Sequence, residues 1–271
     1  MKRTSSELKR LAREHLQGHY GLCIGASVVI TLITSALLIP FSMIYELNQN
    51  STNFIIYQLA NMIIGLISVI LSSGLICIHL KLARKEQPVF SDVFYGFSHR
   101  PDRFIICTIL VVAISLVCVL PLLLLSFFSK IRVLFWIVFI LLLVFTIVAA
   151  FIIEFTFALV YPLLVDNDSM TALEALKSSY SLMKGNKGRL FYITLSFLGL
   201  ELLGLLTCGI GYLWLTPYIT QTSIEFYRDV TGESDRTSEN TNMEREYNFY
   251  SEGVIADFDV TNMPSENDEQ I

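Results

Sequence analysis

Residues 133–165 read VLFWIVFILLLVFTIVAAFIIEFTFALVYPLLV, and Glu154 is the only charged residue in this stretch. A helix of this length would extend for about 50 Å, whereas the hydrocarbon core of a bilayer is about 30 Å thick. The stretch is therefore predicted to cross a membrane as a helix over 133–160. A strong tilt, a break or an extension into the cytoplasm must take up the excess length.

Five other apolar segments are also predicted to cross the membrane. They are 21–45, 54–80, 104–128, 190–206 and 210–227. The first three contain no Asp, Glu, Lys or Arg, and 54% of the chain is hydrophobic, more than is usual for a soluble domain. The last two form one apolar run with a tight reversal expected at Gly209 and Gly211 and a kink at Pro217. The sequence thus predicts an all-α, polytopic bundle of six transmembrane helices.

The basic residues are distributed unevenly between the loops on the two sides of the predicted membrane. Of the 19 Lys and Arg residues, only Lys130 and Arg132 fall on the predicted outer side. Because Lys and Arg accumulate in cytoplasmic loops, this distribution predicts that both termini lie in the cytoplasm. The expected location is the plasma membrane, where the anionic inner leaflet is the expected lipid partner.

Residues 1–20 are predicted to form an amphipathic helix on the cytoplasmic side. Apolar residues and histidines recur there at helical spacing, as in a helix that lies on an anionic leaflet. The recurring positions are Leu8, Leu11, Ala12, His15, Leu16 and His19.

A second, shorter amphipathic segment is predicted in the loop after 54–80. Phe90, Phe94 and Phe97 recur there at helical spacing beside the capping residue Ser91, and aromatic residues suit a membrane interface.

A third amphipathic helix is predicted over 169–184, between the fourth and fifth spans. Thr171 and Glu174 have the spacing of a capping box, and apolar residues fall on one face of the helix that follows. These apolar residues are Leu173, Leu176, Tyr180 and Met183. The helix either covers the loop or forms a docking surface for lipid headgroups or a protein partner. The basic residues expected at this surface are Lys177, Lys184, Lys187 and Arg189.

Residues 231–271 form an acidic tail with 11 Asp and Glu residues and two Arg residues. They contain few aliphatic residues, so they are expected to be disordered in the cytoplasm. Aromatic residues among the acidic ones leave open a short partner-binding segment; these are Tyr247, Phe249, Tyr250 and Phe258. An acidic chain of this kind is not expected to bind nucleic acid.

No catalytic motif and no cofactor-binding pattern occurs in the sequence. The five cysteines lie in or beside apolar spans, without the spacing of a zinc site, and are expected to pack as small residues. Asp166 and Asp168 form a pair of carboxylates near the inner surface, but Asp168 also suits helix initiation. Glu154 and Glu201 are the candidate polar sites within the membrane, because an ionisable group in a span usually faces a partner or a cavity.

The first span carries small residues at intervals of four. Gly21 and Gly25 have GxxxG spacing, and Cys23, Ser27, Thr31 and Ser35 repeat every four residues. Small residues in a span allow a second helix to approach closely. The contact could be within the chain or between two copies in a homo-oligomer.

Several segments together resemble the bacterial multi-pass membrane protein family catalogued as domain of unknown function 975. They are YPLLVDN at 161–167, ALEALKS at 172–178, LMKGNKGRLF at 182–191, LSF at 195–197, LTCGIGYLWLTPY at 206–218, and LARKE at 82–86 with FYGF at 94–97. The resemblance implies a helical domain in the plasma membrane of mainly Gram-positive bacteria, distantly similar to the membrane portion of some glycerophosphodiester phosphodiesterases. It implies no established activity and no catalytic residues. The chain differs from the family pattern at Lys85, where glycine is usual, and at 148–150, where Ile-Pro-Gly is common.

The leading interpretation of the sequence is a non-enzymatic membrane scaffold or regulator of envelope components, with its cytoplasmic loops and tail as contact surfaces. The alternative is a transporter of ions or small molecules, or a transporter subunit, that uses Glu154 and Glu201 along a polar path. A membrane enzyme that acts on lipid headgroups is the third hypothesis.

Overall fold

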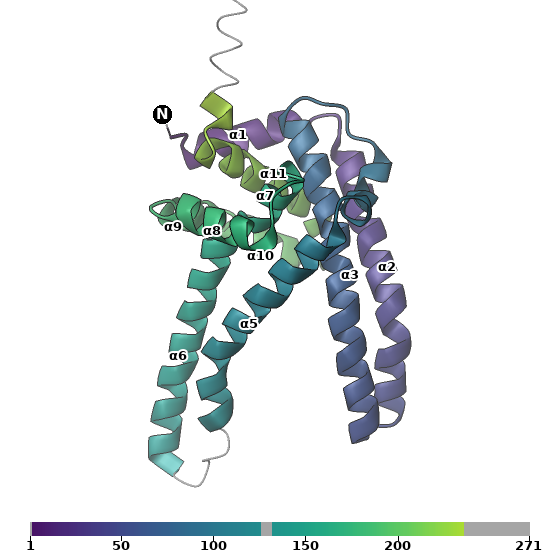
Figure 1. Ribbon diagram of the computed structural model, residues 1–271, viewed down its shortest axis with the longest axis vertical. Coiled ribbons are helices and arrows are strands. Elements are labelled where there is room, and N and C mark those ends of the chain that lie inside the picture. Colours follow the sequence, from purple (N-terminus) through teal and green to yellow (C-terminus); the bar gives the residue numbers. More distant parts are fainter. Residues whose placement is uncertain (1, 126–131, 236–271) are drawn as a thin grey trace, which may run out of the picture.

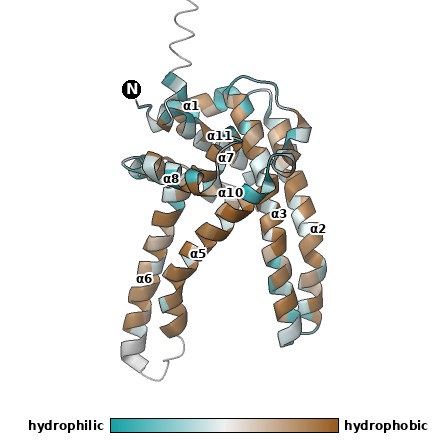
Figure 2. Cartoon of the chain, in the orientation of Figure 1, coloured by the Kyte–Doolittle hydropathy of each residue, from teal (hydrophilic) through white to brown (hydrophobic). Residues whose placement is uncertain are grey.

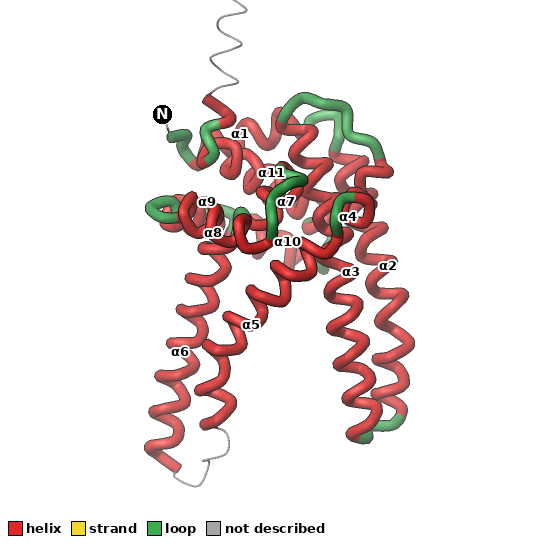
Figure 3. The backbone as a smooth tube through the Cα atoms, in the orientation of Figure 1, coloured by secondary structure: helices red, strands yellow, loops and turns green. Residues whose placement is uncertain are grey.

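The structure is a computed structural model that describes residues 2–125 and 132–235. The described residues form helices joined by turns and loops, without strands, as the sequence predicts (Figure 3). In chain order the helices are α1 (Ser5–Leu16), α2 (Tyr20–Leu47), α3 (Ser51–Ala83), the short 3-10 helix η1 (Phe90–Phe94), α4 (Tyr95–Ser98), α5 (Pro101–Leu125), α6 (Arg132–Phe157), α7 (Val160–Asp166), α8 (Ala172–Met183), α9 (Lys187–Leu195), α10 (Leu198–Leu206) and α11 (Tyr212–Val230).

Four long helices dominate the shape of the molecule (Figure 1). α2 and α3 form one hairpin, α5 and α6 form the other, and the two hairpins are separated at their far ends (Figure 1). The shorter helices gather at the opposite end. Within the described residues, five segments are long and apolar enough to cross a membrane: Tyr20–Leu47, Ser51–Ala83, Pro101–Leu125, Trp136–Asp166 and Lys187–Leu206. The chain is a multi-pass membrane protein.

The predicted number of six spans is not confirmed. The expected span at 210–227 coincides with α11, which is not among the five segments and buries the polar residues Gln221, Thr222, Glu225 and Arg228. The expected span at 190–206 is divided by Ser196 and Phe197 into α9 and α10. In Figures 1 and 3, α8, α9 and α10 are grouped where α6 ends, so hydropathy alone does not describe this part of the chain.

The long apolar stretch 133–165 is divided near its end into two helices, α6 and α7. α6 continues without interruption through 148–150 and ends at Phe157. After two residues the chain re-enters a helix as α7, where Val160, Leu163 and Leu164 are buried in the core. The excess length is therefore used to build a short packed helix.

The apolar face of α1 packs on the protein. Leu8, Ala12 and Leu16 are completely buried, and α1 lies against α11. The expectation that this face rests on an anionic leaflet is wrong, because α11 covers the residues that would enter the lipid. The spacing of the face was predicted correctly, but its partner was not.

The capping box of α8 forms as predicted, and the predicted apolar face is divided between buried and exposed residues. The Glu174 carboxylate accepts from the Thr171 backbone N–H at 2.8 Å, and the Glu174 N–H donates to the Thr171 hydroxyl at 3.4 Å. Of the predicted apolar face, Leu176 and Met183 are buried, whereas Leu173 and Tyr180 are 59% and 58% exposed. The buried residues are Ala172, Ala175, Leu176, Ser179 and Met183. α8 packs against α5, α6 and α7, so contacts on several sides select a face that includes small residues.

Two glycines allow the loop after α3 to fold back onto that helix. A Cβ at Gly74 would overlap the backbone carbonyl of Val93 in η1, and a Cβ at Gly96 would come within 2.5 Å of the Ile70 carbonyl oxygen. The loop is therefore held directly on the α3 backbone. Its aromatic residues Phe90, Phe94 and Phe97 are exposed.

Lys85 ends α3 in a conformation that favours glycine. Its φ is +61°, its N–H donates to the Leu82 carbonyl at 3.0 Å, and the Glu86 N–H donates to the Lys81 carbonyl at 2.9 Å. These two bonds form a Schellman motif, in which the residue at this position is usually glycine. This geometry is consistent with the glycine that the resemblance in sequence implies at this position.

Replacing Lys85 by glycine is expected to stabilise the protein by about 1 kcal/mol, because a side chain in the left-handed region is strained. Thermal unfolding of the purified protein in detergent measures the change. Glu86→Gly is the matched control: Glu86 is also exposed but has no positive φ, so glycine there should give no gain. Equal effects of the two substitutions would contradict the explanation.

Candidate functional site

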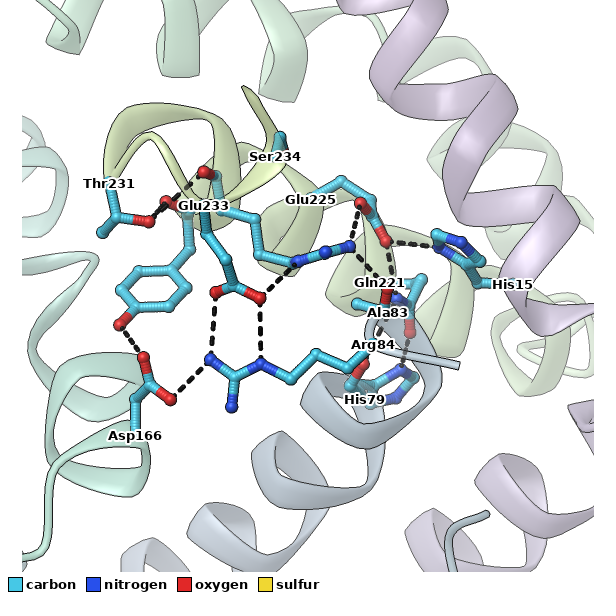
Figure 4. A network of polar contacts seen from close by, with 12 residues as sticks. His15, His79, Ala83, Arg84, Asp166, Gln221, Glu225, Thr231, Glu233 and Ser234 are labelled. Carbon is cyan, nitrogen blue, oxygen red and sulfur yellow. Dashed lines mark hydrogen bonds and ion pairs between the residues drawn. The ribbon is translucent and has the colours of Figure 1, made fainter. Parts of the chain in front are cut away.

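Charged and polar side chains from α1, α3, α7, α11 and the segment after α11 meet at the end where the short helices gather (Figure 4). This group is called the polar junction. It comprises His15, His79, Arg84, Asp166, Gln221, Glu225, Tyr227, Arg228 and Glu233. Its members come from distant parts of the sequence, so it holds the helices of this end together.

Arg84 connects the end of α3 to two acidic residues. Its Nε and Nη2 atoms donate to the two carboxylate oxygens of Glu233, each at 2.9 Å. Its Nη2 also donates to Asp166 Oδ1 at 2.6 Å. The planar guanidinium suits this two-pronged contact, which a lysine could not reproduce. α3, α7 and the residues after α11 are thereby joined at one point.

Arg228 is the second cation of the junction and is almost completely buried. Its Nε donates to Glu233 at 3.0 Å, and its Nη1 contacts the backbone carbonyl of Ala83 and lies 3.5 Å from Glu225. The neighbouring Tyr227 hydroxyl donates to Asp166 at 2.8 Å. A buried charge is tolerated only when it is paired, and Arg228 has three acceptors.

Glu225 is completely buried and starts a chain of hydrogen bonds that runs to α3. Its Oε1 accepts from His15 Nδ1 at 2.7 Å and from Gln221 Nε2 at 3.0 Å. The amide oxygen of Gln221 then accepts from His79 Nδ1 at 2.7 Å. Because a carboxylate and an amide oxygen can only accept, both histidines carry their hydrogen on Nδ1. α1, α11 and α3 are therefore linked through side chains alone.

The Asp166 and Asp168 pair has a structural role at the turn after α7. Asp166 contacts Arg84 and Tyr227, while Asp168 accepts from the Tyr95 hydroxyl at 3.0 Å and lies 3.4 Å from Arg103. The buried Arg103 also donates to the backbone carbonyls of 167, 170 and 99. Both carboxylates accept hydrogen bonds from side chains of other helices, and the Asp168 side chain is 61% exposed.

Arg189, one of the predicted surface contacts, belongs to a second group of polar contacts between helices. Its Nη2 donates to Asp229 at 2.6 Å and to the Arg3 carbonyl at 2.8 Å. Lys2 reaches the side chain of Asn186 at 2.8 Å. The start of α1 is thus fastened to α9 and α11, and Arg189 is used for folding.

The other predicted surface residues remain accessible. Lys177 and Lys184 are exposed and have no ion pair with any described residue. Lys187 is partly exposed and its ammonium lies 5.9 Å from the ring centre of Tyr180. The exposed part of the predicted surface is therefore centred on α8.

The structure does not bring Glu154 and Glu201 together in a shared site. Glu154 is exposed and lies one turn before the end of α6, whereas Glu201 is partly exposed on α10. Neither side chain makes a hydrogen bond or ion pair with a described residue.

The two glycines of α2 do not form its contact with α3. An added Cβ at Gly21 would meet nothing within 4 Å, and one at Gly25 would only touch a ring atom of Phe90 at 4.0 Å. The cluster that joins α2 to α3 instead contains Cys23, Ala26 and Ile30. Ser27, Thr31 and Ser35 therefore remain on an exposed or partly exposed side of α2.

A cleft of about 700 Å³ lies between α1 and the end of α3. Its charged lining residues include His15, Arg84 and Arg228, which are engaged in the polar junction. The lining also includes Lys85 and Glu86, which are exposed at the end of α3.

The contacts of the polar junction, including those of His15, Glu225 and Arg228, were not predicted from the sequence. One signal was present: Glu225 and Arg228 interrupt the apolar pattern of α11 three residues apart, which places them on one face of a helix.

The predicted start of the disordered tail, at residue 231, was too early. Glu233 is part of the folded structure, whereas the predicted disorder from 236 onward lies outside the described residues.

Glu233 makes the stability of the junction depend on pH. Burial raises the pKa of its carboxyl, but the hydrogen bond from Arg84 and the charges of Arg228 and Arg84 outweigh burial, so the pKa lies below its ordinary value. The ionised form therefore stabilises the fold above the ordinary glutamate pKa of about 4.3, and this contribution is lost as the pH falls through the lower folded-state pKa.

Glu233→Gln is expected to weaken the acid dependence of the thermal unfolding temperature below about pH 5, because the titrating carboxyl is gone. Glu46→Gln, at an exposed position near the far end of α2, is the control and should keep the acid dependence of the unaltered chain. Identical pH profiles for all three proteins would contradict the role of Glu233.

A comparison with protein families agrees with the sequence resemblance. The family model described as "Protein of unknown function (DUF975)" matches residues 1–234. Comparisons with curated proteins and with solved structures each gave no match. The matched range ends just after Glu233, so it includes every residue of the polar junction.

Proposed function

The chain belongs to the DUF975 family of proteins of unknown function, and from this premise we propose that it is a non-enzymatic membrane scaffold or regulator of envelope components. It lies in the plasma membrane with both termini and the short helices on the cytoplasmic side. The surface around α8 binds anionic lipid headgroups or a protein partner, and the acidic tail is a second contact segment.

The polar junction is the observation that carries this proposal. Its charged groups are paired with one another and join α1, α3, α7 and α11 at one end of the hairpins. The short helices gathered at this end, together with α11, are called the platform. A scaffold needs a surface of fixed shape. A transport path or a catalytic centre needs polar groups left available for a substrate.

The surface of this platform supports a docking role. Lys177 and Lys184 are exposed on and beside α8, and the neighbouring Leu173 and Tyr180 are exposed apolar residues. Basic residues beside apolar ones suit either the headgroup region of an anionic leaflet or an acidic partner. The separation of Glu154 from Glu201 gives the transporter hypothesis no comparable support.

In-cell crosslinking followed by co-purification tests the proposal. Lys177→Glu with Lys184→Glu should remove crosslinked partners, whereas Lys177→Arg with Lys184→Arg should retain them, because the charge is kept. A chain that ends at 235 tests the tail while keeping Glu233 in the polar junction. Partner sets that stay the same in both the charge-reversed and the shortened proteins, at unchanged protein levels, would contradict a scaffold role.

A further inference from the structure

A groove of about 310 Å³ lies on the outside of α6, where α9 packs against this helix. The rings of Phe155 on α6 and Phe191 on α9 meet edge to face, with their centroids 5.9 Å apart. The ring of Phe151 stacks on that of Phe155 at 6.2 Å. This space is called the α6–α9 groove, and the residues that line it include Val148, Phe151, Ile152, Phe155, Lys187 and Phe191.

One wall of the groove belongs to a helix that crosses the membrane. Most of α6 lies within the apolar segment Trp136–Asp166, and Figure 2 shows this helix as mainly hydrophobic, with hydrophilic residues where α8 lies at its end. Val148 and Phe155 are seven residues apart, so this wall extends for about 10 Å along the helix. Val148 and Ile152 are both more than half exposed. The exposed surface of a span meets the acyl chains of the bilayer, so a lipid chain has direct access to the groove.

Lys187 is the charged residue among those that line the groove. It begins α9, and its ammonium lies 5.9 Å from the ring centre of Tyr180 on α8. It forms no ion pair within the part of the chain that the structure describes, and this includes Glu154 on α6. Arg189, two residues later, differs from it because its guanidinium already donates to Asp229 at 2.6 Å. Lys187 therefore offers a positive charge beside apolar walls.

Apolar walls beside one cation match a ligand that has an apolar chain and an anionic group. An anionic phospholipid has both parts. A peptide fits less well, because its backbone N–H and C=O groups would enter a space where only the Lys187 side chain can form a hydrogen bond. The chemistry of the lining therefore favours a lipid over a protein segment.

We propose that the α6–α9 groove binds one anionic phospholipid, with an acyl chain against Val148, Ile152 and Phe155 and the phosphate next to Lys187. The inference rests on the part of the proposed function that places the platform at the anionic inner leaflet. It adds a defined site for one lipid next to the broader α8 surface.

Native mass spectrometry of the purified full-length protein tests the proposal. The protein in neutral detergent is titrated with phosphatidylglycerol or with phosphatidylcholine of the same acyl chains, and the affinity for the first bound lipid is measured. Phosphatidylglycerol should bind about five-fold more tightly, the effect of one lysine near an anionic group. Lys187→Glu and Lys187→Gln should remove this preference, whereas Lys187→Arg should retain it. Lys177→Glu is the matched control: Lys177 is exposed on α8 but does not line the groove, so the preference should remain.

A second pair of variants tests the apolar wall. Val148→Trp fills part of the groove and should weaken the binding of both lipids. Val144→Trp, one turn away on α6, is the matched control, because Val144 is similarly exposed but does not line the groove. Equal effects of the two tryptophan variants would overturn the proposal.

Equal affinity of the unaltered protein for the two lipids, or a preference that persists in Lys187→Glu, would also overturn the proposal. The measurement contains no partner protein, so its outcome is separate from that of the crosslinking experiment. An unchanged set of crosslinked partners would contradict the scaffold role without altering the lipid affinities. Loss of the lipid preference would contradict the groove without altering the partner set.

Discussion

Replacing Arg228 by alanine is expected to lower the free energy of unfolding by about 3–5 kcal/mol, the range for breaking a buried ion pair from one side. Arg228 is almost fully buried and contacts Glu225, Glu233 and the Ala83 carbonyl. Its removal leaves Glu225, which is completely buried, without its nearest cation. Thermal unfolding of the purified protein in detergent, together with the yield of folded protein, measures the effect.

Arg10→Ala is the control for this substitution. Arg10 pairs with Glu14 one turn later on α1, and both side chains are more than half exposed. Exposed pairs at this spacing contribute about 0.3–0.5 kcal/mol, so the change should be small. If the two alanine variants unfolded at the same temperature, the polar junction would not be what holds this end of the molecule together.

Replacing Gly74 by alanine is expected to destabilise the protein by about 1–3 kcal/mol, the usual range for overpacking. The new Cβ would overlap the backbone carbonyl of Val93, which cannot rotate away as a side chain could. η1 would have to leave α3, and the exposed aromatic residues on it would lose their position. Thermal unfolding and protease cleavage within 84–100 measure the two consequences.

Gly199→Ala on α10 is the matched control. It is also a helical glycine, but an added Cβ there would meet nothing within 4 Å, so alanine should be neutral or slightly stabilising through its higher helix propensity. An unaltered melting temperature for Gly74→Ala would mean that η1 does not lie as close to α3 as the structure describes.

The long helices could be predicted from the sequence, whereas the polar junction could not. Runs such as 21–45 and 104–128 have no alternative to a membrane span, because length and apolar composition suffice. The contact of His15 with Glu225 joins residues 210 positions apart. No periodicity specifies which of many polar residues will meet across such a separation.

Short sequence motifs predicted structure correctly where only neighbouring residues determine it. The capping box at Thr171 requires only residues three positions apart, and it formed as predicted. Which residues of α8 are buried depends on contacts with α5, α6 and α7, and only Leu176 and Met183 of the predicted apolar face are buried. α11 shows the same limit, because its apolar residues suggested a span while its buried polar residues serve contacts with α1 and α3.

The central claim is that the two long hairpins cross the membrane and that the platform formed by the short helices lies on the cytoplasmic side. The starting protein carries Cys118→Ser and Cys208→Ser, so that its remaining cysteines are buried. Single cysteines are then introduced at three exposed positions: Gln49, in the turn between α2 and α3, Gln87, after α3, and Ser181, on α8. A membrane-impermeant thiol reagent is then applied to intact and to permeabilised cells. We expect Gln49→Cys to react in intact cells and the other two only after permeabilisation. Reaction of Gln49→Cys and Gln87→Cys from the same side would contradict the claim.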